Sequence, residues 1–366
     1  MAGAVPYPRQ VGAYELLIPI GSGTTATVYL ARTPTQDGSW KYVALKHFRP
    51  HTLMDDSGLE RRAVREVKLA AILRHPNVVS LLDVGEEDGG QFFVMDYVEG
   101  DTLSALLRWY SARRQRVPMP IAMRIVSDLL CGLEAVHTLR GESGRKLGVV
   151  HRDVSPPNVL VGTRGVARLI DLGMAKVPTW TQVTGKRRIL GRLPYVAPEQ
   201  IAGTEVDQRS DVWSAAVVAW ELFTGRRMFP KSSLRALMDR MRVPPPALRS
   251  VRRDLPVALD HALASALLLD VRDRCPSAGA LLSRLQRAWE PEGRIAEPDE
   301  VGKLVREAVG AKLREREQAM IALLRYRRAL SDLTQSAMRE LAEEELSTST
   351  LRMPTLEPED DEGNEV

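Results

Sequence analysis

Alternating apolar and polar residues dominate the first hundred positions of the chain. Three such runs lie within residues 14–50 and are separated by glycine and turn residues: YELLIPI, TVYLART and KYVALKHF. Two more follow near Val78–Val84 and Phe92–Tyr97, and a helical spacing covers Leu59–Arg74. Period-two alternation is typical of half-buried strands. The pattern therefore predicts an antiparallel sheet of about five strands with one helix.

The pattern becomes mainly helical after Leu103. Ile121–His137 has the spacing of an amphipathic helix, and the chain is mostly helical from Pro198 to Trp289. Between these two stretches, Leu147–Val161 and Ala167–Ile170 are short strand-like segments around a polar loop. The chain is thus of the α+β class, with a small sheet-rich part followed by a larger helical part.

The two ends of the chain carry different patterns. Residues 1–13 resemble a flexible leader, Pro and Glu mark a linker at 291–300, and residues 347–366 are too acidic and polar to fold alone. Residues 301–346 form one long amphipathic helical arm whose apolar stripe must cover something. Three surfaces are open to it: one on the same chain, one on a second copy and one on another protein. Gly302 and Gly310 interrupt the stripe, which makes a regular coiled coil the least favoured of the three.

Composition narrows the class of protein. The 366 residues are 44% hydrophobic, and the two cysteines, Cys131 and Cys275, are too far apart to suggest a disulfide framework or a metal site. No signal peptide and no long apolar run is visible, so we expect a cytoplasmic protein without a membrane span. The net charge of +4 combines a basic body with an acidic tail. We interpret these charges as a solvated surface and expect no nucleic-acid partner.

Two motifs in the first part point to phosphate chemistry. The first is a glycine-containing loop between two predicted strands, made of Gly21, Ser22, Gly23, Thr24, Thr25 and Ala26. Such a loop lets backbone N–H groups approach a phosphate, and a strand rather than a helix follows it here. Taken alone, the loop is equally compatible with a plain β-turn. The second is Lys46, at the end of the VALK strand, with Glu66 on the following helix. A Lys–Glu pair would hold the ammonium group toward phosphate oxygens.

Three motifs in the second part supply carboxylates. Asp153 and Asn158 lie five residues apart on the polar loop HRDVSPPN, where they can act as proton acceptor and metal ligand. Asp171 directly follows the strand VARLI, a position that suits a hard cation such as Mg²⁺. Glu199 stands in Ala-Pro-Glu, 28 residues after Asp171.

These five motifs, in this order and spacing, resemble the eukaryotic-like Ser/Thr protein kinases of bacteria. Further matches are the hinge-like FVMDYVEG with Met95 as gatekeeper, the buried helix around Asp211, and Arg274. The resemblance covers about residues 14–289 and is closest to kinases of myxobacteria. It implies a bilobal kinase domain at 14–290, with a small lobe at 14–97 and a large lobe at 98–290.

The resemblance also implies roles for individual residues. The loop from Gly21 to Ala26 would cover the phosphates of ATP, and Lys46, held by Glu66, would contact them. Asp153 would accept the proton of the substrate hydroxyl, and Asn158 with Asp171 would hold Mg²⁺. The adenine ring would be bound by the side chains or backbone of Val28, Ala44, Met95, Asp96, Val98 and Leu160. Glu199 and Arg274 would form a structural ion pair.

The chain departs from the family pattern at several positions. Ser155 replaces a lysine that touches the γ-phosphate, and Arg192 replaces a threonine that helps to mark Ser/Thr enzymes. We expect an active kinase, and these two residues are the only support for the alternative of a pseudokinase or ATP-binding scaffold. Arg192 is either a replacement for the missing cation or a surface residue of the substrate-binding loop, and its presence leaves the choice between Ser/Thr and Tyr open. A small-molecule kinase is disfavoured by the Ala-Pro-Glu segment.

Regulation is expected at two places. Arg152 beside Asp153 indicates control by phosphorylation of the activation segment, with candidate sites at Thr179, Thr181 and Thr184. The polar end after the arm, Ser347–Thr350, is a candidate for autophosphorylation. The arm at 301–346 is expected to bind a partner or a second copy, and residues 291–366 are expected to be dispensable for basal catalysis.

Overall fold

The computed structural model describes residues 10–23, 26–49, 73–87, 90–141, 143–171, 193–229, 239 and 243–349, with side chains up to residue 341. The chain divides into two compact units, residues 1–315 and 316–366. Each is described by itself. In the described part of the chain, no helix is both long enough and apolar enough to span a membrane.

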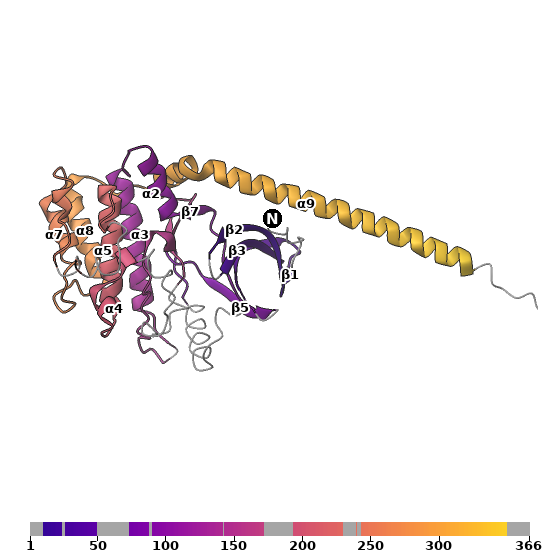
Figure 1. Ribbon diagram of the computed structural model, residues 1–366, viewed down its shortest axis with the longest axis horizontal. Helices are drawn as coiled ribbons and strands as arrows, with labels where there is room; N and C mark the ends of the chain where they lie inside the picture. Colours follow the sequence, from indigo (N-terminus) through magenta and orange to yellow (C-terminus); the bar gives the residue numbers. More distant parts are fainter. Residues whose placement is uncertain are drawn as a thin grey trace, which may run out of the picture. The chain divides into compact units, whose positions relative to one another are not determined.

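The small lobe is an antiparallel sheet in the order β1-β2-β3-β4-β6-β5 (Figure 1). Its strands are β1 (Gln10–Val11), β2 (Tyr14–Ser22), β3 (Ala26–Pro34), β4 (Trp40–Phe48), β5 (Leu81–Glu87) and β6 (Gly90–Asp96). The alternation of apolar residues places Leu16, Val43 and Leu45 on one face with Phe92. Strand β1 lies inside the expected leader, because Val11 is fully buried in the same cluster.

A second sheet of three short strands follows the small lobe. It consists of β7 (Gly100–Thr102), β8 (Val159–Gly162) and β9 (Ala167–Leu169), paired in that order. The expected strand-like run from Leu147 forms only its last part. Gly148 has a φ of 64°, and the N–H groups of His151 and Arg152 donate to the Asp211 carboxylate instead of to a neighbouring strand.

Helices form the rest of the first unit. They are α2 (Leu103–Ala112), α3 (Met119–His137), α4 (Pro198–Ala202), α5 (Gln208–Thr224), α7 (Val257–Ala264) and α8 (Ala278–Trp289), with short 3-10 turns η1 (Pro156–Asn158), η2 (Leu193–Tyr195), η3 (Leu248–Ser250) and η4 (Glu290–Glu292). Helices α5 and α8 pack against α3 (Figure 1). Trp213 and Phe223 of α5 are fully buried, so this helix is the centre of the core.

Helix α9 (Pro298–Ser349) has 52 residues and crosses the boundary between the two units. Its first turns belong to the core of the first unit, where Val301 and Val305 are fully buried. The structure also differs from the expected linker at 291–300, because Ala296 is buried and its N–H donates to the Pro120 carbonyl. The apolar stripe of the arm thus begins on the large lobe and not after a free linker.

Candidate active site

The glycine-containing loop is the tip of the β2–β3 hairpin. Gly21 lies opposite Val28 in the strand register, and Ser22 lies opposite Thr27. The Gly23 N–H donates to the Ala26 carbonyl over 2.9 Å and closes the turn. A strand therefore continues directly from the loop, which is the arrangement of a phosphate-covering hairpin and not of a loop that opens a helix. Thr24 and Thr25 lie outside the described residues.

The ammonium group of Lys46 reaches across from the small lobe to the large lobe. Lys46 lies on β4, and Asp171 lies two residues after the end of β9. The Lys46 Nζ donates to Oδ1 of Asp171 over 2.6 Å. Both side chains are partly buried. This pair brings the expected phosphate-contacting cation and the expected metal-binding carboxylate to one point. Glu66, the partner expected for Lys46 from the sequence, lies outside the described residues.

Asp153 and Asn158 are joined within the catalytic loop. The Asn158 side-chain amide donates to both the backbone carbonyl and the carboxylate of Asp153, over 2.8 and 2.9 Å. The Asn158 carbonyl in turn accepts the N–H of Ile170, the residue before Asp171, over 3.0 Å. Asn158 therefore connects the expected proton acceptor to the strand end that carries the expected metal ligand.

Asp211, in the first turn of α5, holds the backbone of this loop in place. Its carboxylate accepts the N–H groups of His151 and Arg152 and contacts Nε2 of His137, each over 2.7 Å. Burial alone would raise the pKa of Asp211, but the His137 contact and the hydrogen bonds hold it below its ordinary value. Nothing in the sequence marks His137 except its place at the end of a helical stretch, because its partner Asp211 lies 74 residues away.

Two residues of the site have backbone conformations that side chains rarely adopt. Arg152 has a φ of 63° and Asp171 a φ of 56°. Such positions cost free energy, on the order of 1–3 kcal/mol each, and persist where the surroundings determine them. The paired hydrogen bonds to Asp211 hold Arg152, and the contact with Lys46 is made by Asp171. The strain thus lies at the residue before Asp153 and at the expected metal ligand Asp171.

Ser155 occupies the loop between Asp153 and Asn158. Its side chain is fully buried, and its Oγ has no hydrogen-bond partner among the described residues. A hydroxyl at this depth brings no charge to the site. Arg192, which the sequence suggests as a replacement cation, lies outside the described residues.

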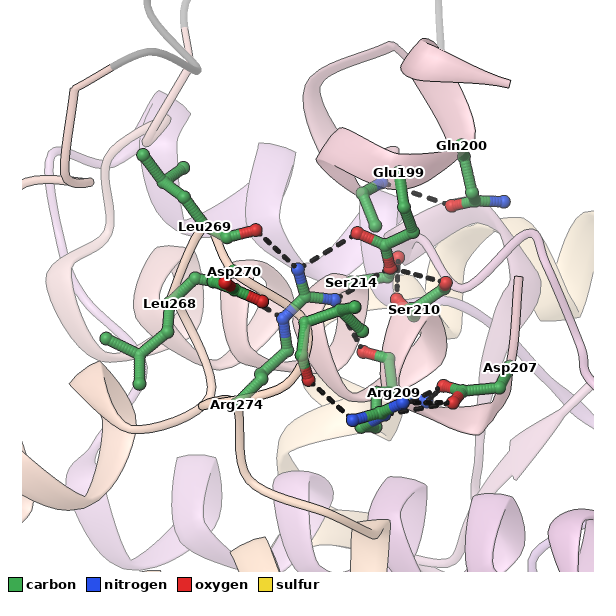
Figure 2. A network of polar contacts seen from close by, with 12 residues as sticks. Glu199, Gln200, Asp207, Arg209, Ser210, Ser214, Leu268, Leu269, Asp270 and Arg274 are labelled. Atoms are coloured by element: carbon green, nitrogen blue, oxygen red, sulfur yellow. Dashed lines mark hydrogen bonds and ion pairs between the residues drawn. The ribbon is translucent and has the colours of Figure 1, made fainter. Parts of the chain in front are cut away.

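Glu199 and Arg274 form a buried bidentate ion pair (Figure 2). The two N–O distances are 2.7 and 2.9 Å, and the Ser210 hydroxyl donates to the same carboxylate. Burial would raise the pKa of Glu199, but the hydrogen bonds from Arg274 and Ser210 lower it below its ordinary value. The guanidinium also lies 5.1 Å from the Trp213 ring centre, so the pair joins α4 to the core helix α5.

The residues expected around adenine lie on neighbouring strands. Val28 pairs with Lys46 and Ala44 with Met95 across β3, β4 and β6, while Leu160 lies on β8. The Asp96 N–H donates to the Ser80 carbonyl, so a contact of Asp96 with adenine must use its carbonyl oxygen. Val98 follows in the segment that joins the two sheets.

Comparison with known proteins agrees with this arrangement. The family model described as "Protein kinase domain" matches residues 14–282. This chain belongs to the protein kinase family. Its small antiparallel lobe and larger helical lobe are the two lobes of the kinase fold. The crystal structure of the Mycobacterium tuberculosis PknI kinase domain covers 78% of this chain and 100% of its own, with a TM-score of 0.60 and 28% identity.

Curated relatives of this kinase come from several bacteria. "Tyrosine-protein kinase MasK" of Myxococcus xanthus is 34% identical over 289 residues, which are 78% of this chain and 44% of MasK. "Serine/threonine-protein kinase pkn3" of the same organism is 33% identical over 286 residues, 75% of this chain and 49% of that protein. "Serine/threonine-protein kinase PrkC" of Bacillus subtilis is 30% identical over 285 residues. The chain spans about half the length of these relatives or less.

Residues 172–192, which make up most of the activation segment between Asp171 and Glu199, lie outside the described residues. This applies to the candidate phosphorylation sites Thr179, Thr181 and Thr184. The described kinase therefore brings together Lys46, Asp153, Asn158 and Asp171 from the expected set, with Glu199 and Arg274 as a separate ion pair.

Proposed function

We propose that this kinase transfers the γ-phosphoryl group of ATP to a hydroxyl group of a protein substrate. The observation that carries the proposal is the coupling of Asp153 to Asn158, with Lys46 and Asp171 joined beside them. Phosphoryl transfer needs positioning and neutralisation of charge more than covalent chemistry by the protein. These four side chains supply a cation, a proton acceptor and two oxygen ligands.

The residues of the site fit a magnesium ion. Since the Asn158 amide nitrogen is used by Asp153, its oxygen is the atom left for a cation, and Asp171 adds a carboxylate. Mg²⁺ usually takes one or two protein oxygens together with the phosphates of its nucleotide. Among the described residues no cluster of three His, Cys, Asp or Glu competes with this site. Bound there, Mg²⁺ would neutralise charge on the phosphates.

The protein's own part in the transfer follows from its contacts. Lys46 would hold the phosphates next to Asp171, and the β2–β3 hairpin would cover them with backbone N–H groups. Asp153, whose position is fixed by the Asn158 amide, would accept the proton of the substrate hydroxyl as the new bond to phosphorus forms. Val28, Ala44 and Leu160 would enclose adenine.

We propose Ser and Thr as the residues that accept the phosphate. The relatives PrkC and pkn3, both named as Ser/Thr kinases, support this choice, whereas the name of MasK points to tyrosine. Ser155 bears on the rate, since loss of a cation beside the developing charge costs on the order of 10²–10³-fold at comparable sites. The expected catalytic residues Lys46, Asp153, Asn158 and Asp171 are all present, so they lend no support to a pseudokinase.

We place the kinase in the cytoplasm of a bacterial cell, where its cysteines, both free, would remain reduced. We further propose that phosphorylation of Thr184, Thr181 or Thr179 activates it through Arg152. The segment at 347–366 is proposed as a disordered tail and the arm as a partner-binding or self-associating element.

One experiment tests the activity and the acceptor together. The purified full chain is incubated with γ-labelled ATP and Mg²⁺ beside Asp153→Asn, and the labelled residues are identified. We expect phosphoserine and phosphothreonine in the wild type and a loss of at least about 10³-fold in the variant. Equal labelling of both proteins would overturn the assignment of Asp153. Label confined to phosphotyrosine would overturn the proposed acceptor class but not the kinase activity.

A further inference from the structure

The first turns of helix α9 lie beside the small sheet that contains β7 (Figure 1). They contact the turn between β8 and β9. A β-carbon on Gly302 of α9 would overlap the Thr163 carbonyl oxygen, and one on Gly165 would overlap the Pro298 carbonyl. Arg306, one helical turn after Gly302, donates to the same Thr163 carbonyl. The two glycines therefore allow α9 and this turn to pack backbone against backbone, and the arginine adds a polar contact.

The same turn is joined to the segment that connects the two sheets. The Thr163 N–H donates to the Glu99 carbonyl, and the Thr163 hydroxyl donates to the Glu99 carboxylate, each over 2.8 Å. The neighbouring Val98 side chain faces Gly162 at the end of β8, where an added β-carbon would lie 3.3 Å from it. Val98 is one of the residues expected at adenine. Thr163 is thus in contact both with α9 and with the segment that carries this residue.

Lys312 of α9 pairs with a carboxylate that the fold has buried. Asp101 lies on β7, is 8% exposed, and has a different partner for each of its two oxygens. Its Oδ1 accepts the N–H of Thr102 over 2.7 Å, and its Oδ2 lies 2.6 Å from Nζ of Lys312. Thr102 caps α2 and lies opposite Leu160, the residue expected beneath adenine. Because a buried carboxylate without a compensating cation is costly, loss of the lysine should draw water to Asp101 and disturb the pairing of β7 with β8.

We propose that Lys312 is a positioning residue for nucleotide binding, a role that rests on the proposed use of ATP and acts through Asp101 on the β7–β8 pair. The match to the kinase family ends at residue 282, so this support for the adenine end of the site comes from outside the matched residues. The residues expected at the phosphates lie on β4, in the catalytic loop and after β9. Loss of Lys312 should therefore weaken binding of the base and leave the rate of the chemical step unchanged.

Calorimetric titration of the full chain with ADP and with a non-hydrolysable ATP analogue, both with Mg²⁺, tests this role without relying on transfer. Lys312→Met should bind both nucleotides about three- to tenfold more weakly than the wild type, since the lysine is half-exposed but its partner is buried. The two losses should be equal, because both nucleotides carry the same base. Lys312→Arg, which keeps the charge, should bind within about twofold of the wild type. The matched control Lys303→Met, at an exposed lysine of the same helix, should bind as the wild type does.

The possible failures of this titration are distinguishable. A wild type that binds nucleotide and a Lys312→Met variant that binds it equally well would overturn the positioning role and leave the proposed kinase activity intact. A wild type that binds neither nucleotide would overturn the proposed activity, and the positioning role with it. A loss confined to the ATP analogue would place the effect at the γ-phosphate and would overturn a role at the base.

Kinetics separate positioning from a general loss of stability. In Lys312→Met, KM for ATP should rise by the same factor as the dissociation constant, while kcat stays within about twofold of the wild type. Val217→Ala in the buried helix α5 lowers stability without contacting this site and should leave KM for ATP unchanged. A fall in kcat at unchanged KM for ATP would overturn the role of Lys312, and so would a rise in KM of the same size in Val217→Ala.

A double-mutant cycle tests whether Lys312 acts through Asp101. Asp101→Asn removes the buried charge that the lysine compensates. In that background, Lys312→Met should cause no further loss of nucleotide affinity, because the two side chains then no longer form an ion pair. A full three- to tenfold loss in both backgrounds would show that Lys312 acts independently of Asp101 and would overturn the proposed connection through β7.

Discussion

Removing the C-terminal helix at two different points should have very different consequences for the kinase domain. A chain that ends at Glu290 loses all of α9, whereas a chain that ends at Glu315 keeps residues 298–315, the part of α9 that is buried in the core. The sequence alone suggests that everything after residue 290 is dispensable for catalysis. The structure predicts the opposite for residues 298–315, because their apolar side chains complete the core.

The size of the effect follows from the buried side chains. Val301 and Val305 are fully buried, and Leu304 and Val309 are exposed by only 8% and 6%. Complete burial of such a side chain contributes roughly 1.5–3 kcal/mol, so the four together contribute about 6–12 kcal/mol as an upper bound. The total stability of a folded domain is about 5–15 kcal/mol. The shorter chain therefore loses a large fraction of its stability.

The assay is thermal unfolding of the two truncated chains and the full chain, followed by circular dichroism. We expect the chain ending at Glu315 to melt within about 3 °C of the full chain, and the chain ending at Glu290 to melt at least about 12 °C lower or to be insoluble. Similar melting temperatures for both truncated chains would refute the reasoning, since α9 would then contribute nothing to the core.

Four further predictions concern single sites. Gly302→Ala should destabilise the kinase by about 1–3 kcal/mol in urea unfolding, because the added β-carbon would overlap the Thr163 carbonyl oxygen. The control Gly310→Ala meets only the flexible Arg314 side chain and should be neutral or stabilising by up to about 1 kcal/mol. Equal effects of the two substitutions would contradict the packing of α9 against Thr163. Lys46→Met and Asp171→Asn should abolish phosphoryl transfer without lowering the melting temperature. Val217→Ala in the buried helix α5 should lower the free energy of unfolding by about 2 kcal/mol and leave transfer intact. Equal loss of stability in all three variants would contradict the assignment of the site. Because the folded-state pKa of Glu199 lies below its ordinary value of 4.5, the stabilisation by its ionised form is present at neutral pH and is lost as the pH falls below 4.5. The difference in free energy of unfolding between the wild type and Glu199→Gln should therefore become smaller at low pH. A constant difference from pH 7 to pH 3 would count against a stabilising role of the ionised carboxylate. Mass spectrometry of the active protein should find phosphate on Thr184, Thr181 or Thr179, and Thr184→Ala should reduce activity most; active protein without phosphate at all three would end this proposal.

Local features of the site were predictable because their chemistry is contained in short segments. The alternation of TVYLA after Gly23 predicts a strand, and the structure has β3 there. The spacing of Asp153 and Asn158 places both on one loop, where the Asn158 amide contacts Asp153. In each case the partners are a few residues apart, so local periodicity and turn chemistry are sufficient.

Contacts between distant segments were harder to predict. The carboxylate of Asp211 holds backbone groups 59 and 60 residues away, and its other partner, His137, lies 74 residues away. In the sequence Gly302 interrupts an apolar helical stripe, but in the structure it allows close packing against the Thr163 carbonyl. The need for a glycine at this position depends on the surface that faces it. That surface is the turn after β8, which contains Thr163 and lies far earlier in the chain.

Residues 298–315 of α9 lie beyond the match to the kinase family, but they contact the part of the domain that carries the site residues. The match to the kinase family ends at residue 282, and α9 begins at Pro298. Yet Lys312 pairs with Asp101 on β7, and the residue after Asp101, Thr102, lies opposite Leu160 in the register of β7 and β8. Leu160 is the residue expected beneath adenine. A helix beyond the matched residues thus contacts the same small sheet that carries Leu160, and its first turns are buried in the core of the kinase domain as α8 is.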